Sequence, residues 1–279
     1  MTAAPLASEI KVDPGATADE ARAFLEHDRL LAAYALADVD QPDLEGSRWW
    51  VARRDGEIRA LALVVEGLPF RPCFAIGANE PLAALFREAI REPRILLAVS
   101  PSGRPAVEAT YRFERSDVMK RMAVNVRTFR PRVAQQVSRL GPEDLAAVVD
   151  LYGHASRTYF TPERLRREIY FGVYQGRSLV AAAGTHVRST RSGIAAVGNV
   201  LTRLAYRGRG MATSCTSAVT EAALEEHRDV VLNVRQENTP AIAVYERLGY
   251  VTHAPFIEGP AVRRAAWERL FDALKEKKQ

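Results

Sequence analysis

The sequence has little cysteine, with only Cys73 and Cys215 among its 279 residues. The two lie far apart in apolar surroundings, without the close spacing of metal-ligating cysteines. This excludes a disulfide framework and a cysteine-based metal site. Both residues are predicted to be buried thiols of a protein in a reducing compartment.

Long hydrophobic runs are also missing from the sequence. No stretch approaches the roughly 20 apolar residues of a membrane span. The first ten residues have neither the basic region nor the apolar region of a signal peptide. We therefore expect a cytoplasmic protein that has no membrane partner.

Charge of one sign is only slightly in excess. The 39 Lys and Arg against 34 Asp and Glu give a net charge of +5 and a pI near 9.3. This balance favours an anionic ligand, but it is too small to predict a nucleic-acid partner. The basic segment 130–139 has no interleaved aromatic residues, so it is interpreted as a solvated linker.

The length and composition describe a globular chain of two domains. A length of 279 residues is near twice the usual domain size of roughly 150 residues. With 47% hydrophobic and 26% charged residues, the chain can bury a core. The pattern of elements restarts after Arg130-Pro131-Arg132, which gives expected domains at 1–130 and 131–279.

Each half shows a helical region followed by a β-hairpin, whose turns are marked by Asp55-Gly56 and Gln175-Gly176. The likeness suggests a duplicated fold, although two unrelated hairpins would look the same. The first half is expected to hold helices at 17–37, with a break near Asp28, at 81–90 and at 106–122, and strands at 49–54, 58–65, 72–76 and 95–99. The second half is expected to hold helices at 142–151, 161–168, 211–226, 239–248 and 260–278 and strands at 170–174, 178–187, 194–201, 230–234 and 250–252.

The most informative segment is Asn199–Ala212, which reads NVLTRLAYRGRGMA. An apolar strand runs into a glycine-rich turn, and an apolar-faced helix follows. Small residues at Gly208, Gly210 and Ala212 let a ligand approach the backbone, and the free N–H groups and dipole of the helix N-terminus attract phosphate. The turn lacks the patterns of a Walker loop and of a dinucleotide fold. Taken alone, it is better explained as a plain connection between strand and helix.

A second motif begins at Asn238 and reads NTPAIAVYERLGY. Asn238 or Thr239 can cap a short helix, Pro240 suits its first turn and Gly249 suits its end. The order of strand, RGRGMA turn, helix, strand and this second motif resembles the GCN5-related N-acetyltransferase (GNAT) family. The string Arg207-x-x-Gly210-x-Ala212 matches the Gln/Arg-x-x-Gly-x-Gly/Ala pyrophosphate loop of that family. The resemblance covers residues 137–257.

The resemblance implies a mixed α/β fold that binds acetyl-CoA in a cleft between two splayed central strands. It also implies that Tyr245 is the acid for the departing CoA thiolate, a task suited to a phenol with a pKa of about 10. Packing in the core is the alternative role for Tyr245. The implied cofactor-binding residues are Val200, Leu201, Thr202, Arg207, Gly208, Arg209, Gly210, Met211, Ala212, Thr213 and Asn238.

The general base is less clear from the sequence. Some relatives use a Glu five residues before the capping Asn, but Asn233 stands there, and an amide cannot accept the ammonium proton. His186 is a catalytic candidate because a neutral imidazole titrates near working pH. A hydrogen-bonded strand histidine, or a water chain as the base, is the alternative. Asn199, a polar residue in an apolar strand, is interpreted as bridging a bulge or bonding substrate.

The first half has Gly77-Ala-Asn-Glu-Pro81 where the phosphate turn would lie, and its acid would repel phosphate. We therefore expect tandem acetyltransferase-like α/β (α+β) domains, each a mixed, mostly antiparallel central sheet flanked by helices, with a degenerate first copy. The second copy is expected to bind acetyl-CoA.

The expected function is an acetyl-CoA-dependent N-acetyltransferase. It would move an acetyl group to a primary amine of a small molecule or a protein by direct attack in a ternary complex, without a metal. A covalent route through Cys215 is not expected, because no histidine stands at a convincing position near it. The alternative function is a non-catalytic acyl-CoA sensor or regulatory module on the same fold. A homodimer is left open.

Overall fold

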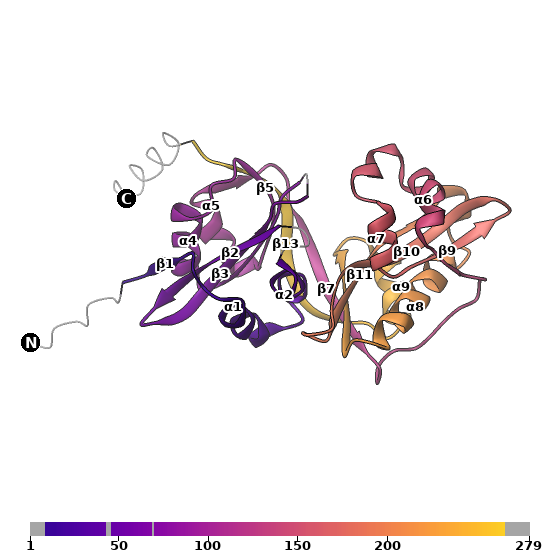
Figure 1. Cartoon of the computed structure of the whole chain (residues 1–279), viewed down its shortest axis with the longest axis horizontal. Coiled ribbons are helices and arrows are strands. Elements are labelled where there is room, and N and C mark those ends of the chain that lie inside the picture. Colours follow the sequence, from indigo (N-terminus) through magenta and orange to yellow (C-terminus); the bar gives the residue numbers. More distant parts are fainter. Residues whose placement is uncertain (1–8, 43–45, 69, 266–279) are drawn as a thin grey trace, which may run out of the picture. The chain divides into compact units, whose positions relative to one another are not determined.

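The computed structural model describes residues 9–42, 46–68 and 70–265 (Figure 1). The chain forms two compact units. Unit 1 comprises Met1–His27, Gln41–Val118 and Pro255–Gln279, and unit 2 comprises Asp28–Asp40 and Met119–Ala254. This division differs from the boundary expected between residues 130 and 131. The physical reason is long-range packing, since an early helix and the strand before residue 130 both belong to unit 2.

Unit 1 is a mostly antiparallel sheet with helices. Its strands follow the order β1-β2-β3-β4-β5-β13, and β6 also pairs with β13. Among its described strands, β4 and β5 are parallel, and helix α4 connects them. Its elements are β1 (Lys11–Asp13), α1 (Ala18–Leu25), β2 (Ser47–Arg54), β3 (Glu57–Val65), β4 (Pro72–Gly77), α4 (Asn79–Glu88), β5 (Arg94–Val99), η2 (Pro101–Gly103), α5 (Arg104–Glu108), β6 (Tyr111–Phe113) and most of β13 (Val251–Arg263).

Unit 2 has the same arrangement, with strand order β7-β12-β11-β10-β9-β8. Here β11 and β12 are parallel, and α8 connects them. Its elements are α2 (Ala33–Asp40), most of β7 (Asp117–Asn125), β8 (Ser138–Arg139), η3 (Pro142–Asp144), α6 (Leu145–Tyr152), η4 (His154–Thr158), α7 (Pro162–Arg167), β9 (Tyr170–Gln175), β10 (Ser178–Ser189), β11 (Ile194–Thr202), η5 (Leu204–Tyr206), α8 (Met211–Leu224), β12 (Asp229–Arg235) and α9 (Thr239–Arg247); η1 (Glu26–Asp28) joins the two units in sequence.

Both units therefore contain an antiparallel hairpin, β2–β3 or β9–β10, followed by a strand–helix–strand with parallel strands. The two hairpin turns carry Gly56 at φ 82° and Gly176 at φ 60°, which glycine adopts readily. This repetition confirms the tandem α/β fold expected from the sequence.

Two expectations about secondary structure are wrong. Residues 106–122 are not one helix, since α5 ends at Glu108 and residues 117–125 form β7, which pairs with β12. Residues 260–263 of the expected terminal helix belong to β13, which pairs with β5, and its remainder from 266 lies outside the described residues. The helical region 17–37 is broken at η1, as expected near Asp28, so that it forms two helices.

The segment 130–139, expected to be a solvated linker, is instead held against α8. Ser217 Oγ accepts from the backbone N–H of Arg132, and Ser214 Oγ accepts from those of Ala134 and Gln135. The side chains at 131–134 are exposed, as expected for a solvated linker, but the backbone is held by two serines of the helix.

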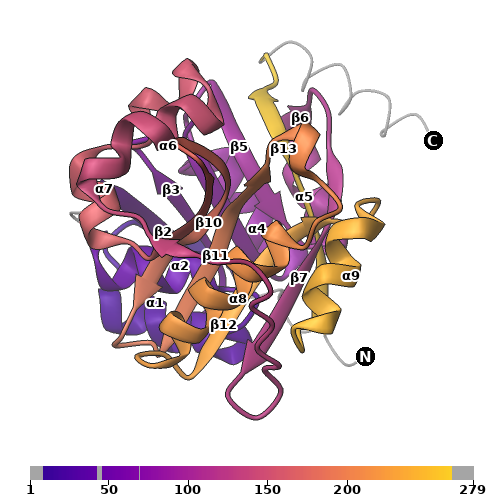
Figure 2. The same cartoon turned by 90° about the vertical axis from the view of Figure 1, so that its right-hand side faces the viewer.

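The sheet of unit 2 is covered on both faces. Helices α8 and α9, in the orange to yellow part of the chain in Figure 2, pack on one face with a core that includes Val197, Leu232 and Met122. Their neighbours Ala196, Val231 and Ala123 point to the other face, where they pack against residues of the α2 segment. Helices α6 and α7 pack on Tyr170 of β9 and Ala182 of β10.

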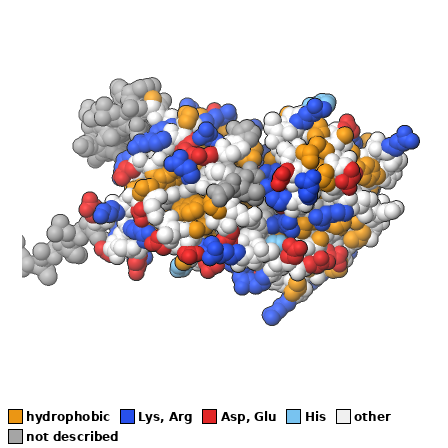
Figure 3. All heavy atoms as spheres, viewed as in Figure 1, with side chains coloured by type: hydrophobic (Ala, Val, Ile, Leu, Met, Phe, Trp, Pro, Cys, Tyr) orange, Lys and Arg blue, Asp and Glu red, His pale blue; other side chains and the backbone are white. Residues whose placement is uncertain are grey.

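Two features of the surface bear on possible partners. Among the described residues, no helix is long and apolar enough to cross a membrane. On the face drawn in Figure 3, the Lys and Arg side chains are interspersed with Asp and Glu rather than gathered into one stripe.

Candidate functional site

The parallel strands β11 and β12 separate before they end. Their pairing covers Ile194–Val197 and Asp229–Leu232. Strand β11 continues to Thr202 on the β10 side, and β12 continues to Arg235 on the β7 side. Beyond Val197 the two strands thus share no register, so the backbone edges of β11 and β12 that face one another are not paired there.

Two bulges re-aim side chains where the strands separate. Asn199 has φ 50°, rare for a residue with a side chain, and Asn199 and Val200 together oppose a single residue of β10. His186 is the extra residue of a second bulge, between the paired residues Thr185 and Val187. Bulges of this kind often occur next to active sites, because they turn a side chain out of the regular alternation.

The glycine-rich turn lies open at the N-terminus of α8. Gly208 and Gly210 both have φ 77°, and a Cβ built on either would meet nothing within 4 Å. Gly210 is the N-cap and provides no side chain, so the first N–H groups of the 14-residue helix keep no side-chain cap. Open space, free N–H groups and the helix dipole together suit an anion such as a pyrophosphate.

The carbonyl groups of the turn are held from the protein side. Gln135 Nε2 donates to the carbonyl of Arg209 at 3.1 Å, and Ser214 Oγ donates to that of Gly210 at 3.2 Å. Arg207 Nε donates to the carbonyl of Thr202, and Arg209 donates to that of Ala205. Fixing these carbonyl groups orients the peptide planes of the turn. Gln135 therefore supports the loop, a role that the sequence analysis did not predict.

The other predicted cofactor residues differ in what they expose. Val200, Leu201, Ala212 and Thr213 are half-buried, while the side chain of Met211 is buried, which leaves its backbone N–H as the group open to a ligand. Thr202 has a buried Oγ1 without a hydrogen bond. Asn238 is exposed and caps α9, since its Oδ1 accepts from the N–H of Ala241 at 3.3 Å.

Tyr245 has a buried ring and a hydroxyl group without a hydrogen bond to any described residue. The residue is 7% exposed and packs edge-on against Tyr250 at 6.1 Å between ring centroids. Burial raises the pKa of Tyr245 to about 12, so its hydroxyl keeps its proton at neutral pH. The ring thus fills the core as the packing alternative predicted, and the hydroxyl is still a proton donor.

His186 lies between two tyrosines and above a glycine. Its Nδ1 is 3.1 Å from the hydroxyl of Tyr34, and its ring is edge-on to those of Tyr34 and Tyr159. Burial lowers the pKa of His186, an effect that Asn199 opposes. The imidazole is therefore neutral at physiological pH and able to accept a proton.

Asn199 joins a cluster of aromatic residues that the sequence did not reveal. Its Nδ2 donates to the hydroxyl groups of Tyr170 at 2.8 Å and Tyr159 at 3.3 Å, and its carbonyl accepts from Tyr152. The bridging of a bulge expected for Asn199 is thus correct. The three tyrosines come from α6, β9 and the loop after η4, so only folding brings them together.

Asn233, which stands where some relatives carry a basic Glu, also faces the region of separation. Its Oδ1 is buried and has no hydrogen bond. In the register of β12 with β7 it lies opposite Arg121, whose guanidinium carbon is 4.8 Å from the ring of Tyr34. The amide of Asn233 is neutral and cannot accept the ammonium proton, so another group has to act as the general base.

Both cysteines are buried, and Cys215 is not placed to act as a nucleophile. Cys215 is fully buried in the core, and burial raises the pKa of its thiol to about 12. The prediction of free, buried thiols is correct for both cysteines. Among the described residues, no group of three or more His, Cys, Asp or Glu could hold a metal ion.

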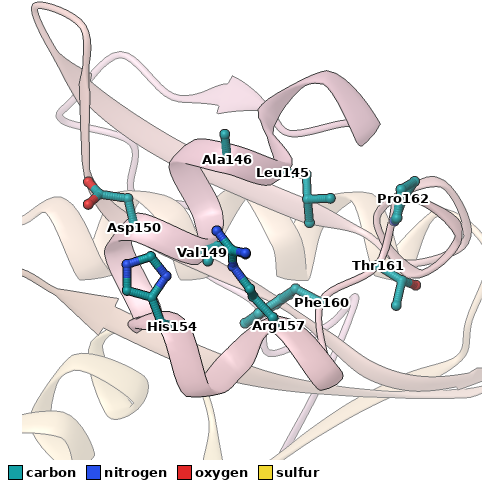
Figure 4. A pocket seen from close by; sticks show the side chains of 9 residues that line it. All are labelled: Leu145, Ala146, Val149, Asp150, His154, Arg157, Phe160, Thr161 and Pro162. Atoms are coloured by element: carbon teal, nitrogen blue, oxygen red, sulfur yellow. The ribbon is translucent and has the colours of Figure 1, made fainter.

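A cavity of about 460 Å³ lies between α6, η4 and the start of α7 (Figure 4). Asp150 and His154 stand at one end of it, and Thr161 and Pro162 stand at the other. None of the sequence-predicted site residues lines this cavity. It is linked to the aromatic cluster through Phe160, which packs on Tyr159 and Tyr170.

Unit 1 lacks these features at the equivalent place. Its parallel pairing runs to Val99, the last residue of β5, so the strands do not separate as in unit 2. Only Ala78 lies between β4 and α4, and a Cβ on Gly77 would lie 2.4 Å from the backbone of Ala60. Glu80 in the first turn of α4 pairs with Arg54. The expectation that the first copy lacks a phosphate turn is correct.

Comparisons with known proteins agree with this geometry. Residues 170–255 match the family model described as FR47-like protein. No curated protein matches the chain.

Several solved structures share the fold of the whole chain. A Drosophila protein has a TM-score of 0.67 at 13% identity, covering 90% of this chain and 98% of that one. A tandem GNAT protein from the clavulanic acid biosynthesis pathway has a TM-score of 0.56 at 16% identity, covering 91% of this chain and 98% of that one. A GCN5-related N-acetyltransferase from Sphaerobacter thermophilus has a TM-score of 0.56 at 17% identity, covering 91% of this chain and 95% of that one. At such identities the likeness is one of fold.

Proposed function

We propose that this chain is a member of the GCN5-related N-acetyltransferase family and an acetyl-CoA-dependent N-acetyltransferase with its active site in unit 2. One observation carries the proposal. The parallel strands β11 and β12 separate directly before an open glycine turn at the N-terminus of a long helix. Unit 1 has the same strands and helix without either feature.

The residues of unit 2 fit acetyl-CoA. Gly208 and Gly210 leave space for a pyrophosphate, and Arg207 and Arg209 add positive charge beside it. In this proposal Val200, Leu201 and Thr202 offer a strand edge to the amides of the pantetheine arm, because β11 is not paired with β12 beyond Val197. Thr213 and Asn238 are proposed to contact the same cofactor. Bound there, acetyl-CoA supplies an activated acetyl group and a thiolate leaving group.

Tyr245 is proposed as the acid for that thiolate. A buried phenol with a pKa of about 12 stays protonated, and its hydroxyl has no hydrogen bond within the described chain to compete with the thiolate. His186 is proposed as the proton acceptor for the amine, because burial keeps its imidazole neutral. The two groups make direct attack of a primary amine in a ternary complex feasible without a covalent intermediate.

The acceptor class is a primary amine of a small molecule or a protein. Titration calorimetry with acetyl-CoA and a screen of primary amines, read by release of free CoA thiol, test the proposal. We expect binding and amine-dependent thiol release. Binding without thiol release from any amine would support the sensor function, and no binding would contradict both functions.

A further inference from the structure

Tyr34 lies across the place where the two central strands separate. It belongs to α2, which lies between β1 and β2 of unit 1 in the sequence but belongs to unit 2. Its hydroxyl contacts His186 on β10, and its ring contacts Arg121 on β7. Strands β12 and β11 lie between β7 and β10 in the sheet. The side chain of Tyr34 therefore lies over β12 and β11, between the side chains of Arg121 and His186.

Tyr34 and Tyr245 approach this place from opposite faces of the sheet. The α2 segment packs on the face of Ala123, Val231 and Ala196. Tyr245 belongs to the core on the other face. In the proposed reaction Tyr245 can thus act on the departing thiolate from one face of the sheet, and Tyr34 can act on the incoming amine from the other.

The imidazole of His186 is half-buried, as Tyr34 is, and its neighbours pack on both ring nitrogens. Gly198 lies against the ring so closely that a Cβ there would be 2.3 Å from Cε1 and 2.4 Å from Nε2. The rings of Tyr34 and Tyr159 pack on it edge-on, at centroid distances of 6.0 and 6.3 Å. Because the Tyr34 hydroxyl already lies on Nδ1, it is the group through which a ligand can exchange a proton with that nitrogen.

We propose that Tyr34 is the catalytic residue that touches the acceptor amine and that it passes the amine's proton to Nδ1 of His186. The inference rests on the proposed function and names a residue that the family motifs do not contain. In this arrangement the hydroxyl of Tyr34 donates to Nδ1, which requires the imidazole to carry its own proton on Nε2.

The transfer balances as follows. The amine nitrogen bonds to the thioester carbonyl carbon and the carbon–sulfur bond breaks, with its electron pair leaving on sulfur. Tyr34 takes the proton of the attacking nitrogen while its own proton moves to His186, which becomes imidazolium. Tyr245 gives its proton to the thiolate. Solvent then removes the proton from His186 and returns one to Tyr245, so amide and free thiol are the products.

Charged and titratable groups from each neighbouring element set the pKa of His186. Burial has the largest effect and lowers the pKa of His186, and a hydrogen bond with Asn199 on β11 raises it. Arg164 on α7 lowers the pKa and Glu168 after α7 raises it. Tyr159 also packs on the ring, and Arg121 lies against the ring of Tyr34. A change at Tyr34 removes one hydrogen bond from His186 and leaves these charges in place.

The first test is the tautomer of His186 in the full chain labelled with ¹⁵N-histidine. The chain has five histidines, and His186→Gln assigns the signal. We expect Nδ1 of His186 to be unprotonated and hydrogen-bonded, and its signal to shift in Tyr34→Phe while the other four stay unchanged. A protonated Nδ1, or no shift in Tyr34→Phe, would overturn the relay.

The second test is the pH profile of turnover with a primary amine that the screen identifies. Tyr34→Phe is expected to lower kcat about a hundredfold, to leave the KM for acetyl-CoA unchanged and to remove the acidic limb due to His186. The matched control is Tyr174→Phe, which removes a hydroxyl that donates to Asp144 at 2.6 Å elsewhere in unit 2. It should keep both rate and profile.

The outcomes separate the relay from the proposed function. An active wild type in which Tyr34→Phe matches Tyr174→Phe overturns the relay alone. A wild type that binds acetyl-CoA and acetylates no amine overturns the proposed function and the relay with it. Equal losses in Tyr34→Phe, His186→Gln and the double variant support a single proton path.

Discussion

Gly198 on β11 and His186 on β10 are in direct contact, with the imidazole ring occupying the space where a side chain at 198 would stand. A Cβ at 198 would lie 2.3 Å from Cε1, 2.4 Å from Nε2 and 2.7 Å from Nδ1 of His186. Real Cβ atoms do not approach other atoms so closely, so the ring and the glycine fix one another.

Gly198→Ala is therefore expected to displace the imidazole. The added methyl group should lower kcat about tenfold or more through the lost position of His186 and should lower the free energy of unfolding by about 1–3 kcal/mol through overpacking. The dissociation constant for acetyl-CoA should not change, since the glycine turn is untouched. If the methyl acts through the ring, adding it to His186→Gln causes no further loss of kcat, whereas additive losses would contradict this coupling.

Tyr245→Phe is expected to lower kcat about a hundredfold while acetyl-CoA affinity stays the same. Because the pKa of Tyr245 is raised to about 12, the hydroxyl is protonated throughout the neutral range, and its acid function is lost only as pH rises toward that value. Wild-type turnover should show no alkaline limb near neutrality from this group. The matched control is Tyr250→Phe, which loses a buried hydrogen bond with Thr220 at 2.7 Å and should reduce stability but not turnover. Equal kinetics in the two variants would exclude the acid role of Tyr245.

The sequence predicted the elements whose signals are local. Asp55-Gly56 marked the first hairpin, Asn238 marked the start of α9, and the two glycines of the turn marked the N-terminus of α8. In each case a few adjacent residues determine the backbone geometry, through a positive φ or a cap. The predictions of the fold and of a cofactor site at this turn therefore depended on short motifs.

The contacts that complete the site could not be predicted in this way. Residues 117–122 belong to the expected helix 106–122, whose sequence is mostly polar and only weakly periodic, but they form part of β7, where pairing with β12 buries even Arg121. Tyr34 and His186 are 152 positions apart in the sequence. Nothing in either local pattern indicates that they meet, since α2 joins unit 2 only through long-range packing.

Gly210→Ala is expected to weaken acetyl-CoA binding about tenfold, because a side chain at φ 77° strains the turn and crowds the place of the phosphates. The chain offers a matched control in Gly176→Ala. Gly176 also has a positive φ and open space around it, but it lies in the β9–β10 turn. Both variants should lose about 1 kcal/mol of stability, and only Gly210→Ala should change the dissociation constant measured by calorimetry. Equal affinities in both would contradict a phosphate role for the turn.

Cys215→Ala is expected to keep the turnover of the wild type. The thiol is fully buried and its pKa is raised to about 12, so it is neither ionised nor accessible for attack on a thioester. For the same reason the native chain should react with a thiol reagent only on unfolding. Loss of most activity in Cys215→Ala, with unchanged thermal stability, would reinstate a covalent route.

Arg29→Met is expected to destabilise unit 2 by loosening the segment that carries Tyr34. Arg29 forms an ion pair with Asp229, which is 14% exposed, and also donates to the carbonyl of Ser192. Removing the cation from a largely buried carboxylate should lower the free energy of unfolding by about 3 kcal/mol, the lower end for such pairs. Arg228→Met is the matched control, because Arg228 contacts the same carboxylate at 3.2 Å but is 71% exposed, which predicts a loss of less than about 1 kcal/mol. Urea unfolding at low and high salt distinguishes the two, since salt screens the exposed pair more strongly. Equal losses for Arg29→Met and Arg228→Met would show that Arg29 does not anchor α2.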